Sequence, residues 1–238
     1  MNRWAFLALI WASPLAAVTC EDMTLGENSF TACTVDMDAD DLRLFLRDGD
    51  GNILGNFANI DNALGDGKLA FGMNAGMYHD DRAPVGHYVQ AGTEVMRVIP
   101  NAGPGNFGLL PNGVFCVNDD SAQVYETLDF IEKEPTCRDA TQSGPMLVID
   151  GDLHPRFLKD GTSRYVRNGV GTSADGKTAI FAISNSVVSF YDFGSFFRDV
   201  LKTPNALYFD GKVSRLHAPS MGRSDLGFRL GPIVGVVE

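Results

Sequence analysis

Apolar residues occur along this chain in short runs of four to seven, separated by polar residues, glycine and proline. Such runs, bounded by turn residues, predict buried β-strands. Aspartate and glycine end several of them, which places polar side chains where strands turn at the edge of a sheet. The clearest predicted strands are 41–46, 69–73, 114–117, 123–126, 146–149, 178–183, 205–209 and 231–237.

Two segments repeat apolar side chains at helical intervals instead. Residues 57–64 predict a short helix that ends before Gly65. Residues 189–201 predict the longest helix of the chain, with one apolar face toward the core. That face consists of Phe190, Phe193, Phe197, Val200 and Leu201.

The chain has 238 residues, 26 glycines and 11 prolines, which favours many turns and short elements. No internal repeat, linker or low-complexity segment divides it. Its length and 45% hydrophobic content are sufficient for one full core. We therefore expect an α+β fold, with a single compact domain of mixed β-sheets and a few flanking helices over residues 18–238.

The first 17 residues predict a signal peptide. Arg3 supplies a positive charge, residues 6–11 form a short apolar core, and residues 13–17 provide small side chains for cleavage after Ala17. Cys20 raises the alternative of a lipoprotein, but Thr19 is a poor residue directly before a lipidated cysteine. No apolar run is long enough to span a bilayer, so we expect an exported, periplasmic or secreted protein without stable membrane insertion.

The net charge of −11 at pH 7 and the pI near 4.7 limit the partners of this chain. An acidic surface repels nucleic acids and anionic membranes, so we expect neither as a partner. An anionic substrate can bind only where local arginine or lysine side chains outweigh the general field.

The four cysteines of an exported chain predict two disulfides. Of the three possible pairings, nearest-neighbour pairing gives Cys20–Cys33 and Cys116–Cys137. A zinc site is the competing interpretation, but no pair has CxxC spacing and no histidine nearby completes a ligand set. We expect no metal and no cofactor.

Asp210 marks the candidate site, because the apolar run 205–209 ends abruptly in this carboxylate and Gly211. Alone, an Asp-Gly pair is an ordinary turn. Two other strand ends carry polar side chains, at 74–76 and 167–169, and we expect all three to converge. Gly76 permits a backbone conformation closed to other residues, which would aim the side chain of Asn74 sideways.

Arg167 is expected to be partly buried, because it is flanked by Val166 and Val170 in a predicted strand. A buried guanidinium needs an anion. That anion is either a carboxylate of the protein, in a structural ion pair, or a bound phosphate, and the residues alone leave both open.

Two other kinds of site are disfavoured by the motifs. The glycine-rich stretch 103–108 lacks the Gly-Lys-Ser/Thr of a phosphate-binding loop. Ser143-Gly144 comes before a predicted strand and no helix follows, so it does not form a nucleophile elbow.

Taken in order, six motifs resemble those of the phosphodiester glycosidase family, most closely its exported bacterial branch. They are NAGMY at 74–78, PNGVF at 111–115, ATQSGPMLVIDG at 140–151, RNGVG at 167–171, NALYFDG at 205–211 and GPIVGVVE at 231–238. The resemblance implies an α+β domain whose polar motifs line one cleft, and hydrolysis of a sugar–phosphate diester at its anomeric bond. Lys212 and Arg215 depart from the small residues common in the family; they could strengthen phosphate binding or block a sugar subsite.

On this resemblance, Asp210 is expected to be the nucleophile or general base and Arg167 to bind phosphate, assisted by Lys212 or Arg215. Asn74 is placed with them as a catalytic residue that orients a sugar hydroxyl or water. Asp80 and Asp81 are candidates for a second carboxylate. The expected substrate-binding residues are Asn168, Gln142, Ser143, Gly76, Gly211, Ser214 and His87.

The expected partner is therefore a sugar-phosphate or polysaccharide substrate. Two alternatives remain at this point. The first is a non-catalytic module that binds an extracellular polysaccharide. The second is a metal-dependent phosphodiesterase that cleaves the P–O bond instead of the C–O bond.

Overall fold

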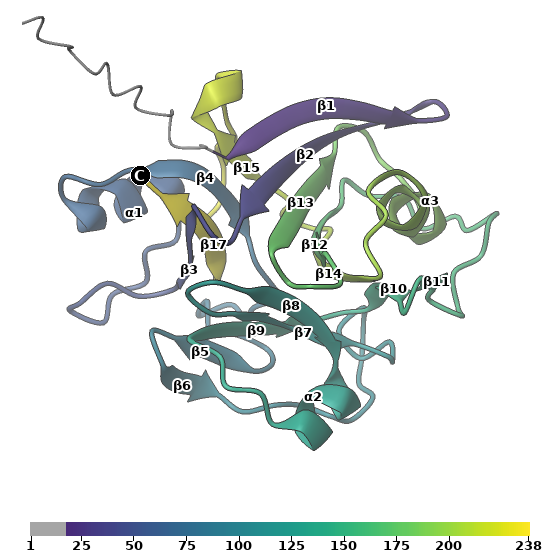
Figure 1. The fold of residues 1–238 in the computed structure, drawn as a ribbon, viewed down its shortest axis with the longest axis horizontal. Coiled ribbons are helices and arrows are strands. Elements are labelled where there is room, and N and C mark those ends of the chain that lie inside the picture. Colours follow the sequence, from purple (N-terminus) through teal and green to yellow (C-terminus); the bar gives the residue numbers. More distant parts are fainter. Residues whose placement is uncertain (1–17) are drawn as a thin grey trace, which may run out of the picture.

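The computed structural model describes residues 18–238, whose strands form three antiparallel sheets around a common core (Figure 1). The predicted signal peptide, residues 1–17, lies outside the described residues. The largest sheet has the order β1-β2-β13-β12-β14-β10-β11. These strands are β1 (Thr19–Leu25), β2 (Asn28–Asp36), β13 (Thr178–Ser184), β12 (Asn168–Thr172), β14 (Asn205–Asp210), β10 (Met146–Ile149) and β11 (Asp152–Leu153).

The other two sheets have five strands each. The second consists, in order, of β16 (Arg223–Ser224), β15 (Leu216–Ala218), β4 (Leu69–Asn74), β17 (Ile233–Val237) and β3 (Asp41–Phe45). The third consists, in order, of β6 (Thr93–Met96), β5 (Tyr88–Gln90), β9 (Asp139–Ser143), β7 (Gly113–Val117) and β8 (Ala122–Glu126). A 3₁₀ turn, η2 (Pro219–Met221), joins β15 to β16.

The main core lies where the inner faces of the three sheets meet. Phe181 and Phe209 of the first sheet, Phe71 of the second and Phe115 of the third are all fully buried in one cluster. Their rings contact one another, with centroid distances of 4.9 Å for Phe71–Phe181 and 5.8 Å for Phe115–Phe181. The predicted α+β class is confirmed, because the chain forms antiparallel sheets and a few separate helices. One shared core holds the three sheets together.

Each outer sheet face is covered by helical residues. Helix α1 (Phe57–Leu64) packs on the second sheet through Phe57 and Ile60, and α2 (Thr127–Lys133) packs on the third through Phe130. Helix α3 (Phe190–Ser195) covers the first sheet (Figure 1). Strands of the first sheet are thus covered on both faces, which explains the continuous apolar run of β14.

The helix predicted over 189–201 begins where expected but is not regular. Ser189 caps α3 in a capping box with Asp192, and a π-helical turn, η1 (Phe196–Val200), follows. This turn shifts the helical register, so Phe196 joins Phe193 and Phe197 in the core while Val200 and Leu201 are only partly buried. Val200 and Leu201 still pack against this core, so the apolar face assigned from the sequence is confirmed, and Phe196 is the residue it omitted.

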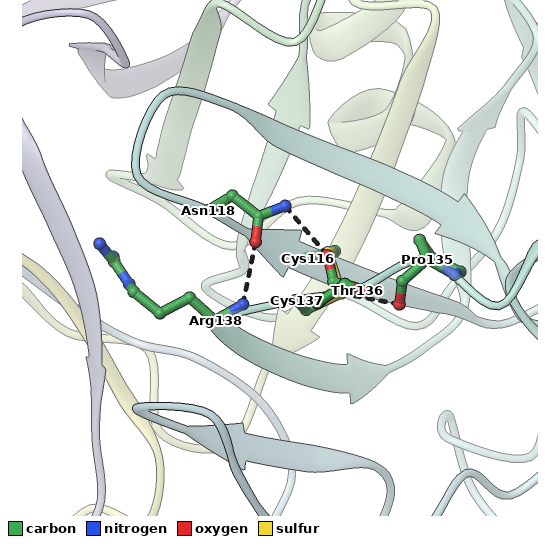
Figure 2. The surroundings of a disulfide bond; sticks show 6 residues. All are labelled: Cys116, Asn118, Pro135, Thr136, Cys137 and Arg138. Carbon is green, nitrogen blue, oxygen red and sulfur yellow. Dashed lines mark hydrogen bonds between the residues drawn. A yellow bond between two sulfur atoms is a disulfide. The ribbon is translucent and has the colours of Figure 1, made fainter.

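Both nearest-neighbour disulfides are present. Cys20–Cys33 joins directly opposed residues of β1 and β2, and Cys116–Cys137 ties β7 to the segment after α2. Figure 2 shows that Asn118 forms two hydrogen bonds with the residues on either side of Cys137. Its Nδ2 donates to the Thr136 carbonyl and its Oδ1 accepts from the backbone N–H of Arg138.

Removing the second disulfide is expected to destabilise the fold without unfolding it. A Cys116→Ser, Cys137→Ser variant should lose about 3 kcal/mol, because the bridge closes a loop across a sequence separation of 21. Urea unfolding of the oxidised variant and wild type measures this. A loss below about 0.5 kcal/mol would contradict it, since the Asn118 bonds would then be sufficient to hold the segment.

Candidate active site

The three polar strand ends expected to converge do meet in the structure. Asn168, at the start of β12, donates through Nδ2 to the carbonyl of Asn74 at the end of β4, at 2.8 Å. Its Oδ1 accepts from the backbone N–H of Asp210 at the end of β14, at 3.2 Å. Ser143 of the third sheet donates to the carbonyl of Phe209, at 2.9 Å, so all three sheets contribute to this region.

A β-bulge shapes the end of β14. Asn168 pairs with Asp210 and Gly169 pairs with Tyr208, so Phe209 has no partner on β12. Bulges bend a strand and re-aim its side chains, and they are common beside active sites. Gly169 is required for this approach, because a Cβ there would lie 2.4 Å from the carbonyl oxygen of Leu207.

The carboxylate of Asp210 lies at the turn that follows the bulge. Its Oδ1 accepts hydrogen bonds from the backbone N–H groups of Gly211, at 2.6 Å, and Lys212, at 2.9 Å. Burial raises the pKa of Asp210 above its ordinary value, and these N–H groups and the charge of Lys212 oppose the shift. The carboxylate is thus held in one orientation but remains more basic than an exposed one.

Arg167 is fully buried, with none of its surface exposed, and immediately precedes β12. Its Nε donates to the carbonyl of Val188, at 3.0 Å, and its Nη2 to that of Ser163, at 2.9 Å. The guanidinium lies 3.6 Å from the centre of the Phe190 ring, a cation–π contact. Burial lowers the pKa of Arg167.

The carboxylate partner considered for Arg167 is not found. Within residues 18–238, no aspartate or glutamate lies within ion-pair distance of its guanidinium. Its Nη1 is buried and makes no hydrogen bond of normal geometry within the same residues. The guanidinium also interacts with the hydroxyl of the neighbouring Tyr208, but that group is neutral. A buried charge without an anionic partner is costly, which points to an anion that is not part of this chain.

Tyr208 lies between the arginine and the aspartate. Its ring centre is 5.4 Å from the guanidinium of Arg167, and its buried hydroxyl interacts with the side chains of Arg167 and Asn106. Burial raises the pKa of Tyr208, Arg167 opposes this, and Asp210 adds to it. The same hydroxyl lies against Gly211, where a Cβ would approach it to 2.0 Å, so only glycine fits there.

A second tyrosine, Tyr78, borders the other side of the aspartate. Burial and the charge of Asp210 raise the pKa of Tyr78, and Arg82 and Arg215 oppose the increase. The guanidinium of Arg82 lies 5.3 Å from the centre of the Tyr78 ring. The region around Asp210 therefore includes several cationic side chains, in a protein whose net charge is −11.

The amides expected to orient a sugar are engaged in hydrogen bonds within the protein. Asn74 and Asn168 are fully buried and bond to each other, and Asn74 Oδ1 also accepts from the backbone N–H of Arg215. Gln142 uses its amide in four hydrogen bonds, to backbone groups of His87 and Ile99 and to Thr127. These side chains position the strand ends.

Three smaller candidates also have internal partners. Ser143 is fully buried, and Ser214 donates to the carbonyls of Val166 and Asp210, at 3.0 and 2.9 Å. A Cβ at Gly76, whose φ is +133°, would lie 2.9 Å from the hydroxyl of Thr141. Ser143 and Ser214 thus hold the backbone at Phe209 and Asp210, and Gly76 allows a close approach to Thr141.

The remaining candidates lie at the edge of the site or away from it. His87 lines a separate cavity of about 450 Å³ with Glu94 and Phe130, and Asp210 and Arg167 are not among its lining residues. Arg215 is buried and its Nη1 donates to the carbonyl of Phe228. Lys212 is exposed beside Asp210, while Asp80 and Asp81 lie on an exposed turn.

Sequence reasoning missed Tyr208, Tyr78 and Phe190 as parts of this site. Tyr208 was assigned to the core because it lies within an apolar run. Strand alternation gives no reliable signal here, because the bulge at Phe209 lies between Tyr208 and Asp210.

The model of the phosphodiester glycosidase family matches residues 67–217, a range that includes Asn74, Arg167, Asn168, Tyr208 and Asp210. This chain belongs to the phosphodiester glycosidase family. The resemblance stated from the six motifs is confirmed.

Two solved structures share the fold of this phosphodiester glycosidase family member. One is the zebrafish N-acetylglucosamine-1-phosphodiester alpha-N-acetylglucosaminidase catalytic domain auto-inhibited by its pro-peptide, with a TM-score of 0.64, 14% identity, and coverage of 95% of this chain and 85% of that chain. The other is a hypothetical protein from Synechocystis, with a TM-score of 0.63 and 13% identity over 92% of this chain; this chain covers 61% of it.

A bacterial relative is closer in sequence. YigE of Escherichia coli K12, an uncharacterised protein, is 32% identical over 215 residues, which cover 89% of this chain and 84% of YigE.

In the described residues, no three histidine, cysteine or acidic side chains gather closely enough to hold a metal ion. Nor is any helix among residues 18–238 long and apolar enough to cross a membrane.

Proposed function

We propose that this protein is a hydrolase that cleaves the glycosidic bond of a sugar-1-phosphodiester in an exported or envelope glycan. Membership of the phosphodiester glycosidase family supports the reaction class. The observation that carries the proposal is the buried guanidinium of Arg167, which contacts the neutral hydroxyl of Tyr208 but has no carboxylate partner in residues 18–238. A phosphate would supply the missing negative charge and acceptors.

Arg167 and Tyr208 together would bind the phosphate. Their polar groups, one a cation and one a hydroxyl donor, belong to neighbouring side chains that interact with each other. Because burial raises the pKa of Tyr208, its hydroxyl stays protonated at neutral pH and donates to a phosphate oxygen. These donors are in place before the reaction and stabilise the negative charge that develops as the phosphate departs.

Asp210 would act at the anomeric carbon, either as the nucleophile or as the base that activates water. The bond that breaks joins this carbon to the phosphate oxygen, and both electrons leave with the phosphate. Since a phosphate is a stable anion, it needs little protonation to depart, and the Arg167–Tyr208 pair takes the place of a strong general acid. The backbone N–H groups of Gly211 and Lys212 hold the carboxylate in position.

The asparagine pair is proposed to position these groups without contacting substrate. Asn168 fixes the backbone of Asp210 through its Oδ1, and Asn74 holds Asn168. The position of Asp210 relative to Arg167, the residue before Asn168, therefore depends on this pair of asparagines, and both asparagines are fully buried.

Export is part of the proposal because the structure holds two disulfides and no free cysteine among residues 18–238. Such bridges persist in oxidising compartments such as the periplasm or the extracellular space. The substrate would then be a glycan or glycoconjugate outside the cytoplasm.

The pH dependence of kcat/KM is expected to carry the signature of a buried carboxylate. Activity should fall as the pH drops through the pKa of Asp210, and this acid limb should lie above the ordinary aspartate value of about 3.9. Because Lys212 lowers that pKa, Lys212→Met should move the limb to higher pH, and Lys68→Met, at an exposed position before β4, should not. A limb that is unchanged in Lys212→Met would argue against Asp210 as its source.

A substrate screen tests the proposal. The mature protein is incubated with a panel of glycosyl-1-phosphodiesters, with and without a chelator, and free sugar and phosphate monoester are measured. Release of both, insensitive to the chelator, is the expected result. Binding without product would favour a polysaccharide-binding module, and chelator-sensitive cleavage a metal-dependent phosphodiesterase.

A further inference from the structure

A second cavity is lined by Ser163 and Phe190, two residues that contact Arg167. It has a volume of about 220 Å³ and lies between the loop 156–163 and the beginning of α3. Its walls include Leu109, Phe157, Leu158, Thr162, Ser163 and Phe190. Asp210 and Tyr78 are not among the lining residues.

Two of these walls also contact the guanidinium. The carbonyl of Ser163 accepts from Arg167 Nη2, at 2.9 Å, and the ring of Phe190 lies 3.6 Å from the guanidinium carbon. Ser163 and Phe190 would therefore contact a ligand in the cavity on one side and the Arg167 guanidinium on the other.

The contacts of Tyr208 relate the cavity to the candidate active site. The ring of Tyr208 lies 4.8 Å from that of Phe190 and 5.4 Å from the guanidinium of Arg167, and its hydroxyl lies against Gly211, so Tyr208 links the cavity wall to the Asp210 turn. If the sugar is at Asp210 and the phosphate at Arg167, the second substituent of the diester points toward the cavity. This step rests on the proposed function.

We propose that this cavity binds the group attached to the far side of the phosphate, and that it selects a ring-sized apolar or aromatic group. Two of its walls are the stacked rings of Phe157 and Phe190, whose centroids lie 5.0 Å apart. Leu109 and the 67% exposed Leu158 add apolar surface. The volume suits one ring rather than a long chain, since drug-sized ligands occupy pockets of about 300–1,000 Å³.

Binding of two phosphate monoesters tests the cavity independently of catalysis. Wild-type protein is titrated with benzyl phosphate and methyl phosphate by calorimetry, and the benzyl ester should bind at least about tenfold more tightly because its ring is buried. In Thr162→Trp, a wall residue replaced by a bulky one, the ratio should fall to about one. Lys159→Trp, in the same loop but not in the lining, should keep the wild-type ratio.

Thermal melting shows whether each variant is folded, and Leu158→Trp provides a second obstruction if Thr162→Trp is not. Equal affinities for the two esters in wild type, or a preference that survives in a folded blocking variant, would overturn the proposal. Failure of the proposed function looks different. In that case no diester releases sugar, while the benzyl preference and its loss on obstruction persist.

Discussion

Replacing Asp210 with asparagine is expected to lower kcat at least about a hundredfold while the fold is retained. An amide can neither attack the anomeric carbon nor take a proton from water. It can still accept the backbone hydrogen bonds of Gly211 and Lys212 through its oxygen, so the turn should keep its shape. Steady-state kinetics on a diester from the screen measure the loss.

The stability of the same variant provides an independent readout. Because burial raises the folded-state pKa of Asp210, its ionised form destabilises the protein above that pKa, and the cost disappears as the pH falls through it. Asp210→Asn should therefore melt at or above the wild-type temperature at pH 7, with a smaller difference at low pH. A clear loss of stability at pH 7 would identify Asp210 as a structural residue.

A matched control exists in the chain. Asp175-Gly176 is a second Asp-Gly turn, and its exposed carboxylate also accepts a backbone N–H, from Lys177 at 3.1 Å. Asp175→Asn should leave kcat unchanged. Since Asn-Gly sequences deamidate readily, the mass of each variant is checked and Asp210→Ala is measured beside Asp210→Asn. Near-normal turnover by a folded Asp210→Ala protein would reject the assignment.

Replacing Arg167 with methionine is expected to lower kcat/KM about a thousandfold, because it removes the charge opposite the departing phosphate. The effect on stability should be small, which separates a functional arginine from a structural one. Methionine packs well against aromatic rings, and Phe190 and Tyr208 remain as neighbours. The carbonyl of Val188, which loses the bond from Arg167, keeps one from the N–H of Tyr165 at 3.2 Å.

Phosphate provides the direct comparison for this variant. Inorganic phosphate should raise the melting temperature of wild type, because it binds only the folded protein, and should not raise that of Arg167→Met. Arg164→Met, at an exposed arginine of the same loop, should respond like wild type. A fall of more than about 3 kcal/mol in the stability of Arg167→Met, with phosphate stabilisation retained, would make Arg167 a structural residue.

The fold was predictable where local pattern and tertiary burial agree. Strands β10, β13, β14 and β17 were predicted because their apolar runs lie between covered faces. Helix α2 was missed, since two of its apolar residues, Leu128 and Ile131, are 60% and 42% exposed and give no clear core-facing stripe. The π turn after α3 was missed because sequence periodicity does not reveal where hydrogen bonding changes.

The candidate site was predictable in its position but not in its inner arrangement. Ordered polar motifs at the ends of apolar runs placed Asn74, Arg167 and Asp210 together. The sequence could not show that three sheets meet there and bury both asparagines, whose amides must then bond to each other. Nor could it show that Arg167 lacks a carboxylate, because an ion pair between distant segments depends on the tertiary fold.

Hydrolysis in ¹⁸O-labelled water tests the central claim most directly, since it reports which bond breaks. A glycosyl-1-phosphodiester is cleaved by the wild-type protein, and the phosphate monoester is analysed by mass spectrometry. The phosphate oxygens do not exchange with water on this timescale, unlike the anomeric hydroxyl of the sugar. Attack at the anomeric carbon predicts a phosphate monoester without label. A product carrying one ¹⁸O would show P–O cleavage and contradict the roles given to Asp210 and Arg167.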